Sequence, residues 1–575
     1  MRVIVWLLIL PLSNSFPIVT EELFDHSGER PPQTQTHSLS QFTRLYDTLS
    51  VIVKDEYKNT IIAHSDEESR IDYEIKNTNE SLNIADFNAN NSIKGELFQG
   101  DIRISVTQLE KIIDGLINDD EEINGSGIEE DGNEYTDKNI IHRRKRRQTI
   151  KGIDVKWSEG VPYSFHPLLS LKARNLIQEA IHFWETQTCI QFRPRFFESQ
   201  YLYFIAADGC WSTVGKDSLQ GQQWISIDKG CEEYGVISHE IGHALGLFHE
   251  QSRYDRDNHI SLDPLRVQLG YIFQFSKIAA SQLSTYNLPY DVGSIMHYAP
   301  NEFSSFSFMP ALSARDPFLQ QSMGQLGGPS FLDVAILNIH YDCRMKCPMK
   351  IPCSNSGYQD ARDCTLCKCP SGFGGIDCRD IESPTIIKCG GVLNATVSPR
   401  QLTVNIKANI MRTTERRCIY HIVAPQNSVK IEIKVIEIDG TCQYGCWKEG
   451  MEIKTQSDPR PVGYRFCCNR QNKTTIISYR HRIPLMVYSR GKNTRTVIHY
   501  RYLRDSENEE ISSGETINRT MNYSNEELNG DLRRGDRVSM LLNNDTDVDE
   551  HFRKRRDTKW IYEDEEEFVI EDRPL

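Results

Sequence analysis

Three histidines and one glutamate between residues 239 and 249 form a pattern that could bind a catalytic metal ion. His239 and His243 are four residues apart, so on a helix both imidazoles lie on one face and could share the ion. Glu240 lies beside them and could take a proton from a water that the metal activates. Gly246 would let the chain leave the helix and reverse, which would bring back His249 as a third ligand. Three imidazoles and one open position predict a catalytic zinc site rather than a structural one.

The segments around these histidines predict the elements that would position them. Apolar residues recur at helical spacing in residues 171–188, and residues 234–247 are the predicted helix that carries the first two histidines. Alternating apolar residues predict strands at 201–206 and 223–228. The second strand could lie at a sheet edge along a cleft, where its backbone would bind an extended peptide.

The whole chain has the features of a secreted protein with several domains. Its 575 residues begin with a short apolar stretch, and residues 1–15 are predicted to be a signal peptide, with an uncleaved anchor as the alternative. No later stretch reaches the length of a membrane span. Sixteen cysteines fit an oxidising compartment, and the net charge of −14 argues against a nucleic-acid partner. The candidate glycosylation sites are Asn79, Asn90, Asn124, Asn394, Asn472, Asn518, Asn522 and Asn544.

Residues 16–147 are polar, contain no cysteine and end in the basic cluster 143–147. Five successive cations predict cleavage by a subtilisin-like convertase after Arg147, which would leave Gln148 as a new N-terminus and residues 16–147 as a pro-peptide. Apolar patterns such as residues 49–62 could form helices that dock on a partner, whereas residues 119–134 are predicted to be solvated. The sequence from Phe98 to Asp101 offers a carboxylate that could occupy the metal until release.

The residues from His239 to Asp257 resemble the signature of the astacin metalloendopeptidases, which belong to the metzincins. The sequence from Ser294 to Tyr298 resembles the Met-turn of the same family. The resemblance covers residues 148–343 and implies an α+β catalytic domain with a mixed sheet and an active-site helix.

The resemblance also assigns roles to single residues. His239, His243 and His249 would bind one Zn²⁺. Glu240 would be the general base and then the general acid, Met296 would pack beneath the metal, and Tyr298 would be a movable further ligand that hydrogen-bonds the transition state.

Regulation of the site is implied in the same way. The sequence ending in Asp101 is similar to the pro-peptide motif of the family, in which the aspartate binds zinc in the zymogen. Glu250 would contact the new N-terminus at Gln148. Arg315 is a candidate for recognising an acidic residue after the scissile bond. The disulfides implied are Cys189–Cys343 and Cys210–Cys231.

Two further modules and a tail follow. The six cysteines in residues 344–379 resemble an EGF-like module with a Cys369–Cys378 disulfide, and a zinc site at Cys364 and Cys367 is the alternative. Short alternating strands predict a β-sandwich in residues 389–502, which resembles a CUB domain with a Cys389–Cys418 disulfide. The pairing of Cys442, Cys446, Cys467 and Cys468 and calcium binding stay open. Residues 503–575 are predicted to be a disordered acidic tail that could be trimmed after Arg556.

These features together predict a secreted zinc metalloendopeptidase of the nematode astacin type, made as a zymogen. It would hydrolyse internal peptide bonds of extracellular or matrix proteins, and its partners would be these substrates, an activating convertase and matrix bound through the EGF-like and CUB modules. The alternative is a catalytically silent secreted adhesion or binding protein with a zinc-stabilised scaffold. A third hypothesis leaves the choice of substrate to the CUB domain alone.

Overall fold

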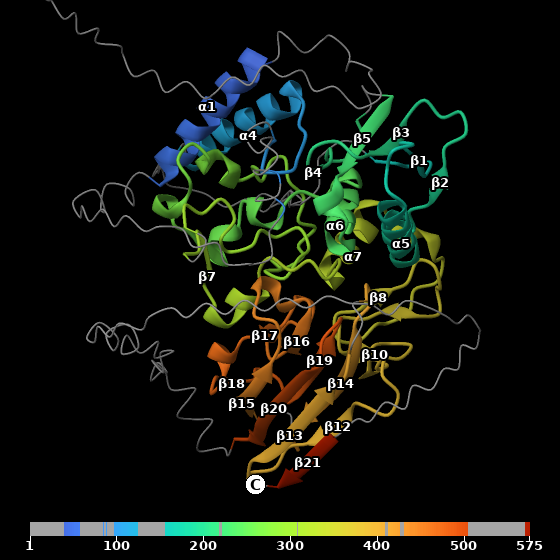
Figure 1. Cartoon of the computed structure of the whole chain (residues 1–575), viewed down its shortest axis with the longest axis vertical. Coiled ribbons are helices and arrows are strands. Elements are labelled where there is room, and N and C mark those ends of the chain that lie inside the picture. Colours follow the sequence, from blue (N-terminus) through green and yellow to red (C-terminus); the bar gives the residue numbers. More distant parts are fainter. Residues whose placement is uncertain are drawn as a thin grey trace, which may run out of the picture.

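The computed structural model describes residues 39–57, 84, 88, 97–124, 156–217, 221–306, 309–408, 412–425, 430–503 and 570–574. The predicted signal peptide, Arg147, Gln148, Arg556 and five of the predicted glycosylation sites (Asn79, Asn90, Asn518, Asn522 and Asn544) lie outside these residues. Figure 1 shows the helices of the N-terminal segment (residues 39–124) at one end, a central region (residues 156–343) in the middle and the C-terminal strands at the other end. Within the described part of the chain, no helix is both long and apolar enough to cross a membrane.

A five-stranded sheet forms one half of the central region. Its order is β2 (Phe192–Pro194), β1 (Val161–Phe165), β3 (Tyr201–Ile205), β5 (Gln222–Ile227) and β4 (Cys210–Trp211). The first four strands are parallel, and β4 pairs antiparallel with β5.

The short strand β4 corrects the expectation that residues 223–228 could lie at a sheet edge. It places Cys210 opposite Ile227 and Trp211 opposite Ser226, so the end of β5 has a partner on that side. The expectation is therefore wrong for this end of the strand. A two-residue strand is too short to produce an alternating pattern in the sequence.

Three helices pack with this sheet and position the histidines. In α5 (Leu171–Gln187) the Ser170 hydroxyl caps the first turn, and Trp184 is buried against α6 with its indole N–H donating to the Ser238 carbonyl at 3.2 Å. The histidine helix α6 (Tyr234–Ala244) ends three residues earlier than predicted. The buried helix α7 (Phe331–His340) begins at a capping box formed by Ser330 and Asp333.

The rest of the central region is irregular. A two-stranded ribbon joins β6 (Ile260–Leu262) to β7 (Leu312–Ala314). Short 3₁₀-helices connect these elements and continue into the C-terminal part: η1 (Lys229–Cys231), η2 (Glu250–Ser252), η3 (Arg256–Asn258), η4 (Pro264–Arg266), η5 (Ile272–Phe275), η6 (Pro317–Ser322), η7 (Cys343–Lys346), η8 (Tyr444–Cys446) and η9 (Asn469–Gln471). Because such turns supply few ladder hydrogen bonds, side chains must hold much of this backbone.

The N-terminal segment docks on this irregular half. Its helices α1 (Leu39–Glu56) and α4 (Val106–Asn124) contact each other, and α1 contacts η5. Their apolar faces bury Leu49, Leu109 and Ile112 against Phe273. Residues 119–124 belong to α4, so the acidic segment that is expected to be solvated begins within a helix. The spacing of apolar residues upstream continues the helix into the acidic run.

Short strands and three disulfides form the cysteine-rich module (residues 344–381). The strands are β8 (Tyr358–Gln359), β9 (Cys367–Lys368), β10 (Phe373–Gly374) and β11 (Asp380–Ile381). The disulfides are Cys347–Cys364, Cys353–Cys367 and Cys369–Cys378. Cys364 and Cys367 are thus both oxidised, and a zinc site at this pair is excluded.

Two five-stranded sheets form the C-terminal sandwich (residues 389–503). One sheet has the order β12 (Gly391–Asn394), β14 (Arg416–Val423), β19 (Arg482–Ser489), β16 (Glu449–Ile453) and β17 (Tyr464–Phe466). The other has the order β18 (Thr475–Ile477), β15 (Ile431–Asp439), β20 (Thr494–Tyr502), β13 (Arg400–Ile406) and β21 (Ile570–Pro574). The disulfides are Cys389–Cys418, Cys442–Cys468 and Cys446–Cys467.

Strand β21 corrects one prediction about the tail. Residues 570–574 pair antiparallel with β13, with Ile570 opposite Val404 and Pro574 opposite Arg400. The expectation of a wholly disordered tail is therefore wrong for these five residues. The edge of β13 offers unpaired backbone groups, and an extended segment of any suitable sequence can satisfy them.

Candidate active site

The three predicted metal-binding histidines come together at one point. His239 and His243 project from one face of α6, with ring centroids 4.6 Å apart. Gly246 adopts a φ of 112°, which a side chain would disfavour, and the chain reverses there. The reversal brings His249 Nε2 to 3.3 Å from His239 Nε2. With Asp101, the ligand atoms of the group all lie within 4.8 Å of one another.

Backbone carbonyls orient the first two imidazoles. His239 Nδ1 lies 2.8 Å from the Ile295 carbonyl, and His243 Nδ1 lies 2.7 Å from the Leu247 carbonyl. When each Nδ1–H donates to its carbonyl, each Nε2 keeps its lone pair for a metal. Burial also lowers the pKa of His243 and lowers that of His249 to about 4. Burial thus favours the neutral form of His243 and His249, which is the form of imidazole that binds zinc.

Asp101 points into the centre of this cluster. One carboxylate oxygen lies 3.1 Å from His239 Nε2, and the other lies 3.2 Å from His249 Nε2 and 3.5 Å from His243 Nε2. Burial would raise the pKa of Asp101, but the adjacent histidines, His249 first among them, hold it well below its usual range. Gln99 and Gly100 both have a positive φ, so the chain makes a tight bend that presents the carboxylate.

The cluster has the donor set and the unsatisfied atoms expected of a zinc site. His243 Nε2, one oxygen of Asp101 and both oxygens of Glu240 are buried and have no hydrogen-bond partner among the described residues. Buried polar atoms of this kind are costly unless a ligand or a metal satisfies them. Three neutral imidazoles and a carboxylate fit Zn²⁺.

Glu240 and Tyr298 lie beside the cluster. Burial, followed by the nearby Asp101 carboxylate, raises the pKa of Glu240 well above its usual range. The Tyr298 hydroxyl donates a 2.5 Å hydrogen bond to the Gln99 carbonyl, and its ring lies 4.9 Å from that of His249. A chain that occupies the site therefore places a backbone carbonyl on the Tyr298 hydroxyl.

Met296 packs beneath the helix that carries the histidines. A Cβ atom at Gly242 would lie 3.2 Å from Met296 Sδ, so glycine leaves the room that the thioether occupies. Sequence reasoning missed Asp333, which fixes this turn by accepting hydrogen bonds from the Ser294 hydroxyl at 2.5 Å and the Ile295 amide at 2.9 Å. Asp333 belongs to α7, and nothing in its local sequence indicates that contact.

Glu250 is buried, as its predicted role requires, but Gln148 lies outside the described residues. One Glu250 oxygen accepts hydrogen bonds from Arg253 at 3.0 Å and from the Asp291 amide at 2.8 Å. Burial raises the pKa of Glu250 to about 7. A cavity of about 10 Å³ adjoins Glu250 and Asp291.

Several residues that sequence reasoning missed hold the N-terminal segment in the site. Asn88 donates to the carbonyls of Gly100 and Cys210, both at 2.8 Å, and accepts from the Cys210 amide. Gln274 accepts from the Gly100 amide at 3.1 Å. Ser212 exchanges backbone hydrogen bonds with the segment, accepting from Arg103 and donating to Asp101. A single asparagine or glutamine carries no sequence signal for such contacts.

The remaining predicted positions are less closely connected with the cluster. Arg315 is exposed and donates to the Asp257 carbonyl, and it does not line the cavity of about 40 Å³ beside His239 and Tyr298. Disulfides join Cys189 to Cys343 and Cys210 to Cys231. Of the predicted glycosylation sites, Asn394 is exposed, Asn472 accepts a hydrogen bond from the Ile438 amide, and Asn124 ends α4.

Comparisons with known proteins agree with this geometry. Residues 149–342 match the family model of the astacin peptidases. The zinc metalloproteinase nas-29 of Caenorhabditis elegans is 42% identical over 80% of this chain and 85% of its own length, and nas-23 of the same organism is 40% identical over 69% and 70%. A solved structure of High choriolytic enzyme 1, a hatching-enzyme zinc protease of Oryzias latipes, is 32% identical in sequence and has a TM-score of 0.30. The match covers 32% of this chain and 90% of the chain of that structure. The chain therefore belongs to the astacin family, and it is a zinc metalloendopeptidase.

Proposed function

We propose that this zinc metalloendopeptidase is secreted as a zymogen and that, once activated, it cleaves internal peptide bonds of extracellular or matrix proteins. One arrangement carries the proposal: the Asp101 carboxylate lies within 3.5 Å of the Nε2 atoms of His239, His243 and His249. The N-terminal segment thus occupies the position that a substrate needs. Eight disulfides, which include all sixteen cysteines, support an oxidising compartment.

The chemistry follows from the residues around the cluster. His239, His243 and His249 would hold the zinc, which when bound would supply Lewis acidity for the scissile carbonyl and for the attacking water. Glu240 accepts the proton of that water and donates it to the leaving amine. The Tyr298 hydroxyl, which here donates to the Gln99 carbonyl, donates to the scissile carbonyl oxygen once the N-terminal segment has left. The buried Glu240 argues against the alternative of a silent binding protein.

Activation begins with convertase cleavage after Arg147, which cuts the covalent link between the N-terminal segment and the catalytic domain. The ordered bend of the segment and its helices α1 and α4 would then be held by non-covalent contacts alone. The new N-terminus at Gln148 would pair with Glu250, a carboxylate whose pKa is raised to about 7 by burial. A nearby ammonium group favours the ionised carboxylate and would complete this part of the cleft.

The other modules extend the proposal to substrates. We assign the cysteine-rich module to the EGF-like class and the C-terminal sandwich to the CUB class, on the cysteine spacing and the two five-stranded sheets. These modules would contact matrix or secreted proteins, and the exposed Asn394 is the glycosylation candidate best placed for modification.

The test compares Glu240→Ala with wild-type protein after identical activation. Casein hydrolysis should fall by about 10³-fold, within the range for loss of a general acid–base, while the zinc content stays unchanged. Glu159→Ala is the matched control, because Glu159 is an exposed glutamate of the same region. Undiminished hydrolysis by the Glu240→Ala protein would refute the proposed function.

A further inference from the structure

The loop of residues 322–328 forms a wall of the cleft next to the zinc site. Gly324 and Leu326 line the cavity of about 40 Å³ that also contacts His239 and Tyr298. The loop packs without spare room on this inner side. A Cβ atom at Gly235 would lie 1.9 Å from the Leu326 carbonyl oxygen, and one at Gly324 would lie 2.5 Å from Ala299 Cα.

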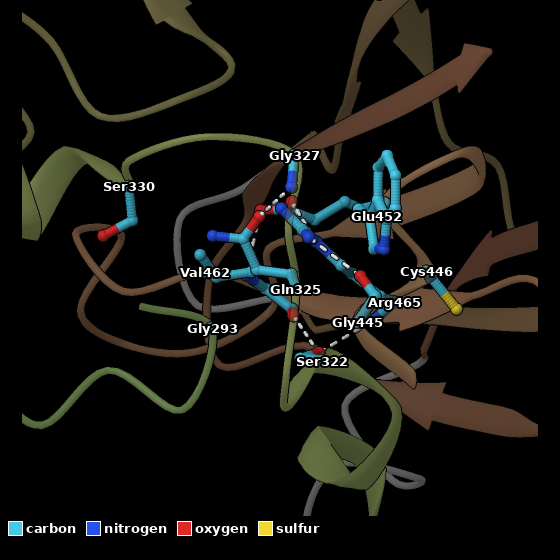
Figure 2. A network of polar contacts seen from close by, with 12 residues as sticks. Gly293, Ser322, Gln325, Gly327, Ser330, Gly445, Cys446, Glu452, Val462 and Arg465 are labelled. Carbon is cyan, nitrogen blue, oxygen red and sulfur yellow. Dashed lines mark hydrogen bonds and ion pairs between the residues drawn. The ribbon is translucent and has the colours of Figure 1, made fainter. Parts of the chain in front are cut away.

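The outer side of the same loop packs against the C-terminal sandwich. Figure 2 shows Ser322, Gln325 and Gly327 of the loop among residues of the sandwich. A Cβ atom at Gly445 would lie 2.3 Å from Gln325 Cα, so the two backbones are in direct contact. Arg490 Nη2 donates to the Gly327 carbonyl at 2.7 Å. One loop therefore has a cleft on one side and the sandwich on the other.

Ser322 fastens the start of the loop to strand β17. Its hydroxyl donates to the Gly463 carbonyl at 2.8 Å and accepts from the Arg465 amide at 3.2 Å. Both partners are backbone groups of the sandwich, so the contact does not depend on flexible side chains. A hydroxyl that both donates and accepts fixes the spacing of the two segments.

A second contact reaches the segment just before the Met-turn. The Val462 amide of the sandwich donates to Asp291 at 3.0 Å, and the Asp291 amide donates to Glu250 at 2.8 Å. A Cβ atom at Gly293 would lie 2.4 Å from Val462 Cβ. Because Gly293 precedes Ser294, the sandwich touches the backbone that leads to Met296.

The contacting surface of the sandwich is itself rigid. Glu452 is buried, accepts from the Gly463 amide at 2.9 Å and pairs with Arg465 at 3.0 Å, while Arg465 also donates to the Gly445 carbonyl at 2.9 Å. The Cys446–Cys467 disulfide joins the same two segments. Arg490 is held by the Trp447 and Thr413 carbonyls. Such a surface can position a loop rather than merely cover it.

We propose that the C-terminal sandwich is a positioning component of the catalytic cleft, and that Arg490 and Val462 set the shape of the pocket beside the zinc. This inference rests on the proposed function. A sandwich that only docked substrates would not affect a peptide too short to reach its surface. A sandwich that positions the cleft should affect such a peptide, which would be cleaved less well when these contacts are lost.

The experiment uses the activated full chain with Arg490→Ala and, separately, the milder Val462→Ala. A short internally quenched peptide and a peptide library report activity and the residues preferred around the scissile bond. We expect kcat/KM for the short peptide to fall by about 10- to 100-fold in Arg490→Ala, because small misplacements far from the reacting atoms have effects of this size. Val462→Ala should change it in the same direction by less, and both should alter the library preference.

Two comparisons separate this role from simple loss of folding. Arg495→Ala is the matched control, because Arg495 is an exposed arginine that pairs with Glu437. Both residues belong to the sheet of the sandwich that does not contain β17. Arg495→Ala should leave activity and preference unchanged, and Arg490→Lys should restore part of the loss. Unchanged kcat/KM and unchanged preference in both Arg490→Ala and Val462→Ala would overturn the inference. Absence of activity in wild-type protein would instead refute the proposed function.

Discussion

Replacing Asp101 with alanine should weaken latency in a form of the protein that cannot be cut. The carboxylate makes two contacts at 3.1 and 3.2 Å and one at 3.5 Å with histidine Nε2 atoms. Removing one partner of a buried charged pair costs about 3–5 kcal/mol, and this is the scale for the contact between Asp101 and the histidine cluster. At about 1.4 kcal/mol for each factor of ten, the fraction of molecules with an open cleft should rise by about 10²–10⁴.

The substitution should not abolish latency, because other contacts of the same bend remain. Gln99 donates to the Ser276 carbonyl at 3.0 Å, and Gly100 donates to Gln274 at 3.1 Å. Phe98 is fully buried, and burial of such a side chain contributes about 1.5–3 kcal/mol. The uncut Asp101→Ala protein should therefore be active, but less active than the mature enzyme.

The assay combines Asp101→Ala with alanines in place of the basic cluster 143–147, so that convertases cannot act. Hydrolysis of a quenched peptide is compared with the same uncut protein carrying Asp101, and the zinc content is measured in both. Asp114→Ala is the matched control, since Asp114 is an exposed aspartate of α4 in the same segment. If Asp101→Ala is as silent as its parent, steric cover by the segment, and not the carboxylate, maintains latency.

Three further outcomes are expected. Burial and the neighbouring Asp333 raise the pKa of Asp291 to about 6, so the folded state binds more protons than the unfolded state and loses about 3 kcal/mol of stability as the pH rises from about 4 through 6. The melting temperature of Asp291→Asn should therefore rise relative to that of the wild type across this pH range. A melting-temperature difference that stays constant with pH would contradict the raised pKa of Asp291. Gly235→Ala should lower both the melting temperature and kcat/KM, because its Cβ atom would lie 1.9 Å from the Leu326 carbonyl oxygen and overpacking costs about 1–3 kcal/mol. Arg362→Ala removes hydrogen bonds to the Glu185, Thr188 and Ile190 carbonyls and should lower the melting temperature while short-peptide hydrolysis is retained; a large loss of hydrolysis would show that the cysteine-rich module also shapes the cleft.

The sequence predicted best what depends on short spacings. The interval between His239 and His243 indicates a shared helix face, and Gly246 indicates the reversal that returns His249, because both follow from local backbone geometry. Helix α5 was predicted within one residue at its end, since its apolar face repeats along the whole helix. Asp101 was a candidate from its chemistry, and the family resemblance supported it; it lies far away in the chain but within hydrogen-bond distance of His239.

Contacts between distant segments could not be predicted. Asp333 is a polar residue at the start of a helix, and its capping role gives no sign that it also holds Ile295. The pairing of Cys442 with Cys468 and of Cys446 with Cys467 depends on how two loops of the sandwich meet, which spacing alone does not determine. Strand β4 was missed because two residues are too few to show a period.

These missed contacts explain how an irregular region can hold a precise site. The segments beside the histidines, such as the Met-turn and the loop 322–328, lack the regular hydrogen bonds of a helix or sheet. Backbone groups of these segments are satisfied instead by Asp333, by the Glu250 amide and, through Arg490, by the sandwich. The imidazole of His239 depends on this chain of contacts, since the Ile295 carbonyl orients its Nδ1 atom. Geometry at the metal is thus set by residues well outside the signature, which is why substitutions in the sandwich should affect catalysis.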